Sequence, residues 1–264
     1  MIILKLGGSV ITKKEAEEPL IDHDNLSRIS KEIADSSFDK LIIVHGAGSF
    51  GHPSAKKYGI GSPITNEEDF TRKKLGFCIT QSWVKKLNTI VCDSLREKGI
   101  LAVSIQPSSF IITKNKRIYS CNLDLINKYL ELGFVPVIYG DVVPDLDESI
   151  KICVLSGDQI INYLGENLKP TRVILGSDVD GIYTKNPKKY DDAELMNNVT
   201  SCEDLVAEGS LNVDVTGGMN GKLIELIELA QLGVESEIIN AGKENFIKRA
   251  LNHEKGIGTI IKKK

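Results

Sequence analysis

The sequence lacks the long apolar runs that mark membrane-spanning or exported proteins. Its longest apolar runs, at residues 41–44 and 134–139, fall far short of the ~18 residues needed to cross a bilayer. The N-terminus becomes charged and glycine-rich too early for a signal peptide. We therefore expect a soluble, cytoplasmic protein without a membrane partner.

Cysteine is sparse and scattered. The chain has five, an odd number, with no CxxC pair and no histidine nearby at metal-ligand spacing. They are Cys78, Cys92, Cys121, Cys153 and Cys202. We expect reduced structural thiols and no metal site built from protein ligands.

An excess of charge of either sign is also missing. The 33 basic residues nearly cancel the 36 acidic ones, so nothing global favours nucleic acid or an anionic membrane as a partner. If an anion is bound, local geometry must bind it. The 41% of hydrophobic residues indicates a packed core, and 264 residues fit one large α/β domain or two lobes.

Short apolar runs alternate with amphipathic stretches along the whole chain. Buried strands are predicted at residues 2–6, 41–44, 101–105, 135–139, 173–175 and 237–239. Helices are predicted at 67–98, 123–132, 159–167, 217–232 and 245–251, and one more begins at Asp24 as its cap. This alternation predicts a three-layer αβα sandwich around a largely parallel sheet.

Three glycine-rich segments lie where this fold would bind a ligand. They are residues 5–9, 45–52 and 216–219, and two of them follow predicted strands, whose carboxyl ends form the binding edge of open α/β sheets. Glycine lets backbone N–H groups approach an anion, and a following helix start adds partial positive charge. Each segment alone could be a simple turn, but their joint placement favours a phosphate site.

Two common nucleotide motifs do not fit. The GxxxxGK[ST] pattern is absent, and the GxGxxG form at residues 46–51 has no acidic residue on a second strand about twenty positions later. Asp69 and Asp93 fall in the long predicted helix instead. A Rossmann dehydrogenase is therefore disfavoured.

Charged residues near these segments are candidates for binding phosphate. Lys5 interrupts an apolar strand, where a lysine is costly to bury unless an anion meets it. Lys14 and Lys222 could equally be solvated surface residues. His45 and His52 could each be core histidines, although the position of His52 in a glycine loop before proline favours exposure to the ligand.

Three aspartates have two possible roles each. Asp158, after Gly157, could cap a helix or could hold Lys5 and Lys222 in position. Asp178 and Asp180 resemble turn residues, yet they follow another strand and so lie on the same rim.

Taken together, these motifs resemble the amino-acid kinase superfamily, through residues 5–9, 178–184 and 214–219 with Lys222. Within it, the chain is similar to the isopentenyl phosphate kinases of the archaeal type, through residues 7–14, 45–53, 104–109 and 155–158. The motifs keep the family's order over nearly the whole chain. The His52-Pro53 ending separates this group from uridylate, aspartate and acetylglutamate kinases, which lack the acceptor-site histidine.

The resemblance implies transfer of the γ-phosphoryl group of ATP to isopentenyl phosphate, giving isopentenyl diphosphate and ADP. It also implies Mg²⁺ bridging ATP oxygens without a dedicated carboxylate cage, and a homodimer. Two alternatives stay open: a kinase of the same fold acting on another small phosphate or carboxylate acceptor, and a nucleotide-binding protein without enzymatic activity.

The resemblance also implies a role for individual residues. ATP would be held by Lys5, Gly7, Gly8, Ser9, Gly48, Asp178, Gly217, Gly218 and Lys222. The acceptor phosphate would be bound by Ala47, His52 and Gly157. Lys14 would follow the transferred group, and Asp158 would organise the lysines. Ala47 stands where many relatives have glycine and Ser177 where many have threonine, and the extra methyl group of Ala47 leaves the loop conformation there open.

This assignment agrees with the chemistry of the reaction. An acceptor phosphate is already an anion, so no general base is needed, and catalysis becomes positioning and charge neutralisation. Residues 1–170 carry most acceptor motifs and residues 171–264 most nucleotide motifs, so we expect a single domain, 1–264, with two functional halves. An apolar slot for the prenyl tail is expected beside Phe77 and Ile79.

Overall fold

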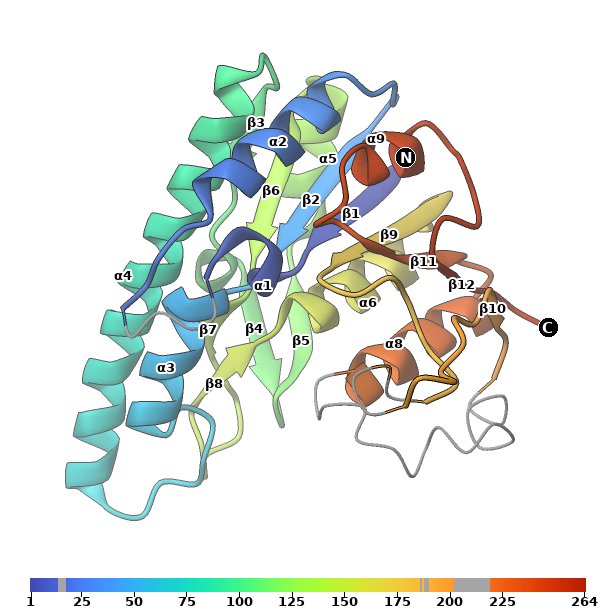
Figure 1. Ribbon diagram of the computed structural model, residues 1–264. Helices are drawn as coiled ribbons and strands as arrows, with labels where there is room; N and C mark the ends of the chain where they lie inside the picture. The colour runs from blue at the N-terminus through green and yellow to red at the C-terminus, as the bar shows by residue number, and fades with distance from the viewer. Residues whose placement is uncertain (14–17, 186, 188–189, 202–218) are drawn as a thin grey trace.

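A mostly parallel sheet forms the middle of the molecule (Figure 1). The structure is a computed structural model that describes residues 1–13, 18–185, 187, 190–201 and 219–264, the last segment with side chains from residue 223 onward. In this part of the chain, eight strands follow the order β10-β12-β11-β9-β1-β2-β6-β3. They are β1 (Ile2–Leu6), β2 (Leu41–His45), β3 (Ala102–Ser104), β6 (Val135–Tyr139), β9 (Arg172–Ser177), β10 (Asn198–Val199), β11 (Ser236–Asn240) and β12 (Thr259–Ile261). Strands β11 and β12 pair antiparallel, and the other pairs of this sheet are parallel.

Helices cover both faces of the sheet. The described helices are α1 (Gly8–Ile11), α2 (His23–Ala34), α3 (Gly48–Tyr58), α4 (Glu67–Glu97), α5 (Leu123–Glu131), α6 (Gly157–Leu168), α8 (Met219–Gln231) and α9 (Phe246–Leu251). One apolar cluster joins the sheet to α2, α4 and α9, and a second joins it to α5, α6 and α8. The predicted three-layer αβα architecture is confirmed.

Alternation along β1 decides which layer each side chain enters. Ile2 and Leu4 belong to the cluster on the α2 side, whereas Ile3 belongs to the cluster on the α6 side. Successive strand residues point to opposite faces, so Lys5 shares the face of Ile3. The strand therefore directs the Lys5 side chain toward α6.

Helix caps explain where the helices begin. Asp22, not Asp24, is the N-cap of α2, and its carboxylate accepts a hydrogen bond from the N–H of Asn25 at 3.1 Å. Asp24 lies in the first turn instead, where a negative charge favours the helix dipole. Asn66 caps α4 in the same way by accepting from the N–H of Asp69 at 2.8 Å. No described helix is long and apolar enough to cross a membrane.

The expectation of a loop over residues 45–52 is wrong in its second half. Helix α3 begins at Gly48 and continues through His52, with Pro53 inside it. Contacts with α4 outweigh the cost of the proline: Thr80 donates to Ser54 at 3.0 Å, and Tyr58 packs closely over Gly76.

Two hairpins outside the main sheet were not predicted. They are β4 (Ile111–Lys114) with β5 (Arg117–Cys121), and β7 (Asp141–Pro144) with β8 (Ile152–Leu155). Asp145 holds the first hairpin by accepting from the N–H groups of Asn115 at 3.0 Å and Lys116 at 2.7 Å. Both turn residues have positive φ, 51° and 63°, without a glycine, and so they give no hairpin signal in the sequence.

Candidate active site

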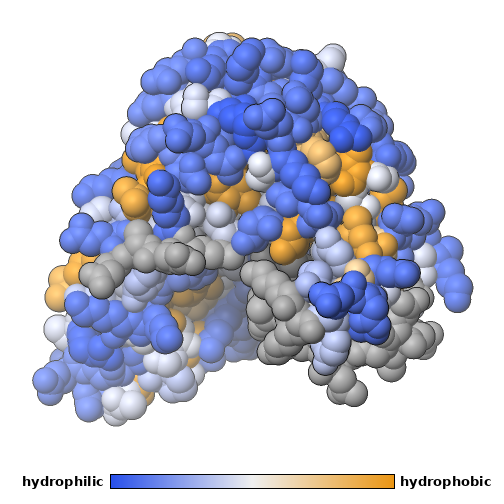
Figure 2. All heavy atoms as spheres, in the orientation of Figure 1, coloured by the Kyte–Doolittle hydropathy of each residue, from blue (hydrophilic) through white to orange (hydrophobic). Residues whose placement is uncertain are grey.

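The site lies at the carboxyl ends of β1, β2 and β6, where α1, α3 and α6 begin. In Figure 2 the surface is hollowed between the side that carries α3 and the side that carries α8. Parallel strands bring their carboxyl ends to one edge, so residues distant in sequence meet there.

An ion pair between Lys5 and Asp158 joins the first strand to α6. The Lys5 side chain is 6% exposed and that of Asp158 is 22% exposed, so the pair lies at the boundary between core and site. Asp158 therefore contacts Lys5 directly, as its predicted role of holding this lysine in position requires. Ser156 caps α6 by accepting from the N–H of Gln159 at 3.2 Å, which leaves the Asp158 carboxylate to bind the lysine.

The two N-terminal glycine segments cross in contact. A methyl group on Gly8 would lie 2.6 Å from the Cα of Gly48, and one on Gly46 would lie 2.7 Å from the backbone nitrogen of Gly8. Gly48 also has φ +51°, a conformation that favours glycine. These positions need glycine so that the ends of β1 and β2 can approach each other.

Thr12, which the sequence analysis did not single out, links the two glycine segments by hydrogen bonds to Gly8 and Ser49. Its buried hydroxyl donates to the carbonyl of Gly8 at 2.8 Å and accepts from the N–H of Ser49 at 3.2 Å. The N–H of Gly7 donates to the carbonyl of Gly176 at 2.8 Å, so this amide already has a partner within the sheet. Contacts to a nucleotide from this segment would come more readily from Gly8 and Ser9.

His52 and Ala47 come from α3, which faces the site. His52 is exposed, as predicted, one turn into the helix. Ala47 precedes the first residue of α3, and its methyl group takes the space over Gly51, where an added Cβ would lie 2.5 Å away. Gly51 thus accommodates the side chain that distinguishes this loop.

His45 is a core histidine that supports the loop from below. Its Nδ1 lies 3.0 Å from the carbonyl of Gly46, and the amide of Asn88 lies 3.0 Å from its Nε2. Its ring stacks on Tyr139 with centroids 5.5 Å apart. Burial lowers the pKa of His45 to about 4, so at neutral pH the ring is uncharged.

Gly157 opens α6 directly beside Lys5. A methyl group added there would lie 3.6 Å from Cε of Lys5 and 3.5 Å from the carbonyl oxygen of His45, both ordinary contact distances. The first N–H of α6 and the lysine of β1 therefore belong to one site. The charge of Lys5 and the helix start both favour an anion there.

On the other side, Asp180 organises the segment after β11. Its carboxylate binds Lys243 at 2.7 Å, the side-chain amide of Asn240 at 2.8 Å and the hydroxyl of Tyr183 at 3.2 Å. The contact with Lys243 contributes most to holding the pKa of Asp180 below its usual value. Asp178, the predicted nucleotide residue, is exposed two positions earlier, beside Ser177.

Several predicted site residues cannot be placed. Lys14, Gly217 and Gly218 lie outside the described residues, and Lys222 lies in α8 with no side chain described. Among the described residues, no three His, Cys, Asp or Glu side chains gather as metal ligands.

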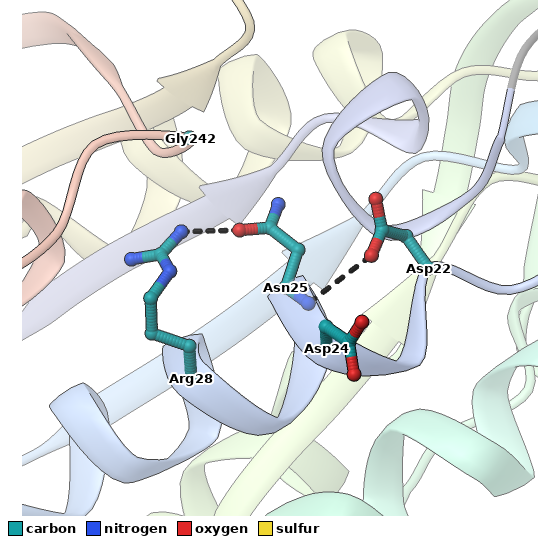
Figure 3. Close-up of a pocket in the computed structure, with 5 residues that line it drawn as sticks. All are labelled: Asp22, Asp24, Asn25, Arg28 and Gly242. Carbon is teal, nitrogen blue, oxygen red and sulfur yellow. Dashed lines mark hydrogen bonds between the residues drawn. The ribbon is translucent and has the colours of Figure 1, made fainter.

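A second, open hollow lies between α2 and the segment after β11 (Figure 3), lined by Asp22, Asp24, Asn25, Arg28 and Gly242. Arg28 binds the side chain of Asn25 and the carbonyl of Ala241. Arg28 therefore fastens the loop after β11 to α2, which is a structural role.

Comparison with known proteins shows the family to which the chain belongs. The amino acid kinase family model matches residues 1–240. Isopentenyl phosphate kinase from Methanothermobacter thermautotrophicus is 59% identical, with 99% of this chain and 98% of that protein covered. The Arabidopsis thaliana isopentenyl phosphate kinase is 32% identical over 98% of this chain and 95% of its own.

Solved structures agree as well. An isopentenyl phosphate kinase crystal structure superposes with a TM-score of 0.91 at 56% identity, covering 99% of both chains. A product complex of the Thermoplasma acidophilum isopentenyl phosphate kinase superposes with a TM-score of 0.78 at 30% identity, covering 99% of this chain and 100% of that one. The chain belongs to the amino acid kinase family and, within it, to the isopentenyl phosphate kinases.

Proposed function

We propose that this protein transfers the γ-phosphoryl group of ATP to isopentenyl phosphate, forming isopentenyl diphosphate and ADP. The observation that carries the proposal is the Lys5–Asp158 pair at the start of α6, in a chain 59% identical to an isopentenyl phosphate kinase over nearly its whole length. The ammonium of Lys5 is held at the carboxyl end of β1, where open α/β sheets bind their ligands.

The acceptor phosphate is assigned to the side of α3 and α6. His52 would donate a hydrogen bond to it, together with the N–H groups of Ala47 and Gly157. The two N–H groups lie at helix starts, where the helix dipole adds to the attraction, and His52 lies one turn into α3.

The nucleotide is assigned to the opposite side. Lys5, Gly8, Ser9 and Gly48 would meet its phosphates, with Lys14, Lys222, Gly217 and Gly218 completing the site and Asp178 lining the pocket. In this proposal residues 1–170 would supply the acceptor half together with several contacts to the ATP phosphates, and residues 171–264 would complete the nucleotide half.

The chemistry needs little from the protein beyond position and charge. An oxygen of the acceptor phosphate attacks the γ-phosphorus, the bond to the β,γ-bridging oxygen breaks, and ADP leaves with that oxygen. Lys5 neutralises charge on the transferring group while Asp158 fixes the direction of its ammonium. No proton must be removed, so no general base is required.

Mg²⁺ is proposed to enter with ATP. The described residues offer no cage of carboxylates, and Mg²⁺ commonly binds through nucleotide phosphates and water. Its contribution when bound is to offset charge on the ATP oxygens. A homodimer is likewise proposed from the resemblance alone.

The prenyl tail is assigned to the side of α4 that carries Phe77. At 100° per residue, Phe77 and Ile79 point about 160° apart around the helix axis, so the two cannot line one slot together. Phe77 shares its side with Gln81, which donates to Ser108 at 2.9 Å beside the start of β7. Phe77 is half-buried there and remains the candidate for contact with the tail.

A coupled ADP-release assay tests the function. Purified protein is given ATP, Mg²⁺ and a panel of isopentenyl phosphate, other short prenyl phosphates, and small phosphate or carboxylate acceptors without a prenyl tail. Highest kcat/KM is expected with a short prenyl phosphate, with isopentenyl diphosphate identified as product by mass spectrometry. No turnover of isopentenyl phosphate beside good turnover of a non-prenyl acceptor would favour the second candidate, a kinase of the same fold with another substrate.

A further inference from the structure

Gly140 connects β6 to β7 at the floor of the site, and nothing in its backbone requires glycine. Its N–H donates to the carbonyl of His45 at 2.9 Å. Its φ lies outside the left-handed region, unlike Gly48 or Gly59. An alanine there would not have to adopt a left-handed φ.

Steric crowding does not require glycine there either. A methyl group at this position would lie 3.4 Å from the carbonyl oxygen of Leu155, 3.5 Å from the nitrogen of Ala47 and 3.6 Å from the nitrogen of Gly157. These are ordinary van der Waals distances, in contrast to the 2.6 Å that a methyl group on Gly8 would meet. Close packing therefore does not explain why residue 140 is a glycine.

The atoms around this space are informative. Two of the three are backbone nitrogens at the starts of different helices, α3 and α6, and amides at helix starts have no carbonyl partner within their own helix. Lys5 lies close by, with its Cε 3.6 Å from where a Cβ of Gly157 would be. Two amide nitrogens, each at a helix start, and the carbonyl oxygen of Leu155 thus border a space of about one methyl group.

An anionic oxygen fits that description. An oxygen accepting from both amides would sit about 2.7–3.2 Å from each nitrogen. A Cβ on residue 140 would touch both nitrogens and occupy much of the same volume. Any side chain at this position would therefore compete with the oxygen for it.

We infer that Gly140 is a specificity-determining residue, whose bare Cα leaves the space in which one oxygen of the acceptor phosphate reaches the N–H groups of Ala47 and Gly157. The inference rests on the proposed function, because it takes the acceptor to carry a phosphate. Gly140 would act by having no side chain in this space, and not by contacting the phosphate itself.

Gly140→Ala tests this directly. The KM for isopentenyl phosphate should rise at least about 10-fold, in line with losing a charge-assisted hydrogen bond, while the KM for ATP changes less than 2-fold. Gly140→Ser, with a larger side chain, should raise the acceptor KM further. Isothermal calorimetry with isopentenyl phosphate alone should show the same loss of binding.

Gly99→Ala serves as a control for general destabilisation. Gly99 follows α4 with φ +85° and no atom within 4 Å of an added Cβ, so this variant strains the backbone far from the site. It should lose a few degrees of melting temperature and keep both KM values. Assays run below the lowest melting temperature of the set separate binding from folding.

The outcomes separate this inference from the proposed function. An unchanged acceptor KM in Gly140→Ala, or equal rises in both KM values, overturns the role of Gly140 even if isopentenyl phosphate is the substrate. If the wild type instead uses a different phosphate acceptor, the proposed substrate is wrong, and a selective rise in the KM of that acceptor still supports the role. A wild type that turns over only carboxylates overturns both.

Discussion

The ammonium of Lys5 and the carboxylate of Asp158 form an ion pair across 153 positions of sequence. The lysine comes from β1, one of the two central strands of the sheet, and the aspartate comes from the first turn of α6. Asp158 holds the ammonium of Lys5 in position, so the effects of the two residues on phosphoryl transfer should depend on each other.

The first prediction concerns this unit. Lys5→Met should lower kcat by at least about 100-fold, since it removes charge that stabilises the transferring group. Asp158→Asn should lower kcat by about 10-fold, because the ammonium loses its fixed direction. In the double variant the loss should be close to that of Lys5→Met alone, since positioning matters only while the lysine is present. Steady-state kinetics of the wild type, the two single variants and the double variant tests this. If the kcat loss of the double variant equals the product of the two single losses, the residues act independently.

The second prediction concerns His52. His52→Gln should lower kcat/KM for isopentenyl phosphate by at least about 100-fold, the usual effect of losing a donor to the transition state. Its side chain is exposed, so the melting temperature should not change. The KM for ATP should also stay constant.

His23→Gln is the matched control, because His23 is an exposed histidine at the first position of α2. It should behave as the wild type. Near-normal kcat/KM in His52→Gln would remove His52 from the acceptor site.

The third prediction concerns the glycine crossing. Gly48→Ala combines a left-handed φ with an added Cβ that would overlap the hydroxyl of Thr12 and lie 3.0 Å from the carbonyl oxygen of Gly8, so Thr12 and the ends of β1 and β2 must move apart. We expect a stability loss of about 2–4 kcal/mol and a large loss of activity.

Gly133→Ala isolates the backbone part of that cost. Gly133 has φ +81° with no atom within 4 Å of an added Cβ, so it should lose only about 1 kcal/mol and keep its activity. Urea unfolding of both variants tests the difference. Equal losses would mean that the close approach of Gly8 and Gly48 carries no cost of its own.

The fold was largely predictable because its central strands are short runs of mostly apolar residues. Runs such as 135–139 match β6, and the helix predicted at 67–98 differs from α4 by one residue. Lys5 could be singled out because it is a charge within such a run. These features are local, and local patterns are what a single sequence reveals.

The features that were missed depend on tertiary contacts. Helix α3 contains two glycines and a proline in its first six residues, and packing on α4 makes it a helix. Thr12 acts through neighbours that only the folded chain brings together, and the role inferred for Gly140 depends on such neighbours too. Asp180 resembled a turn residue until Lys243 and Asn240 were seen to bind it.

The fourth prediction concerns pH and His45. Its native pKa is about 4, while in the unfolded chain it should titrate near the ordinary value of about 6.5. Between about pH 6.5 and pH 4, His45 is therefore protonated in the unfolded chain but not in the native protein. The free energy of unfolding falls as the pH is lowered through this range. Between pH 7.5 and 5.0 this single group should lower the free energy of unfolding by about 2 kcal/mol.

The variant His45→Gln tests this pH dependence, because glutamine keeps an acceptor for Asn88 but does not titrate. This part of the pH dependence should vanish in the variant, even though repacking lowers its stability at every pH. Urea unfolding of both proteins at the two pH values gives the comparison, in which carboxylates common to both cancel. If the wild type and the variant lose the same free energy between pH 7.5 and 5.0, then His45 titrates normally and is not held neutral in the core.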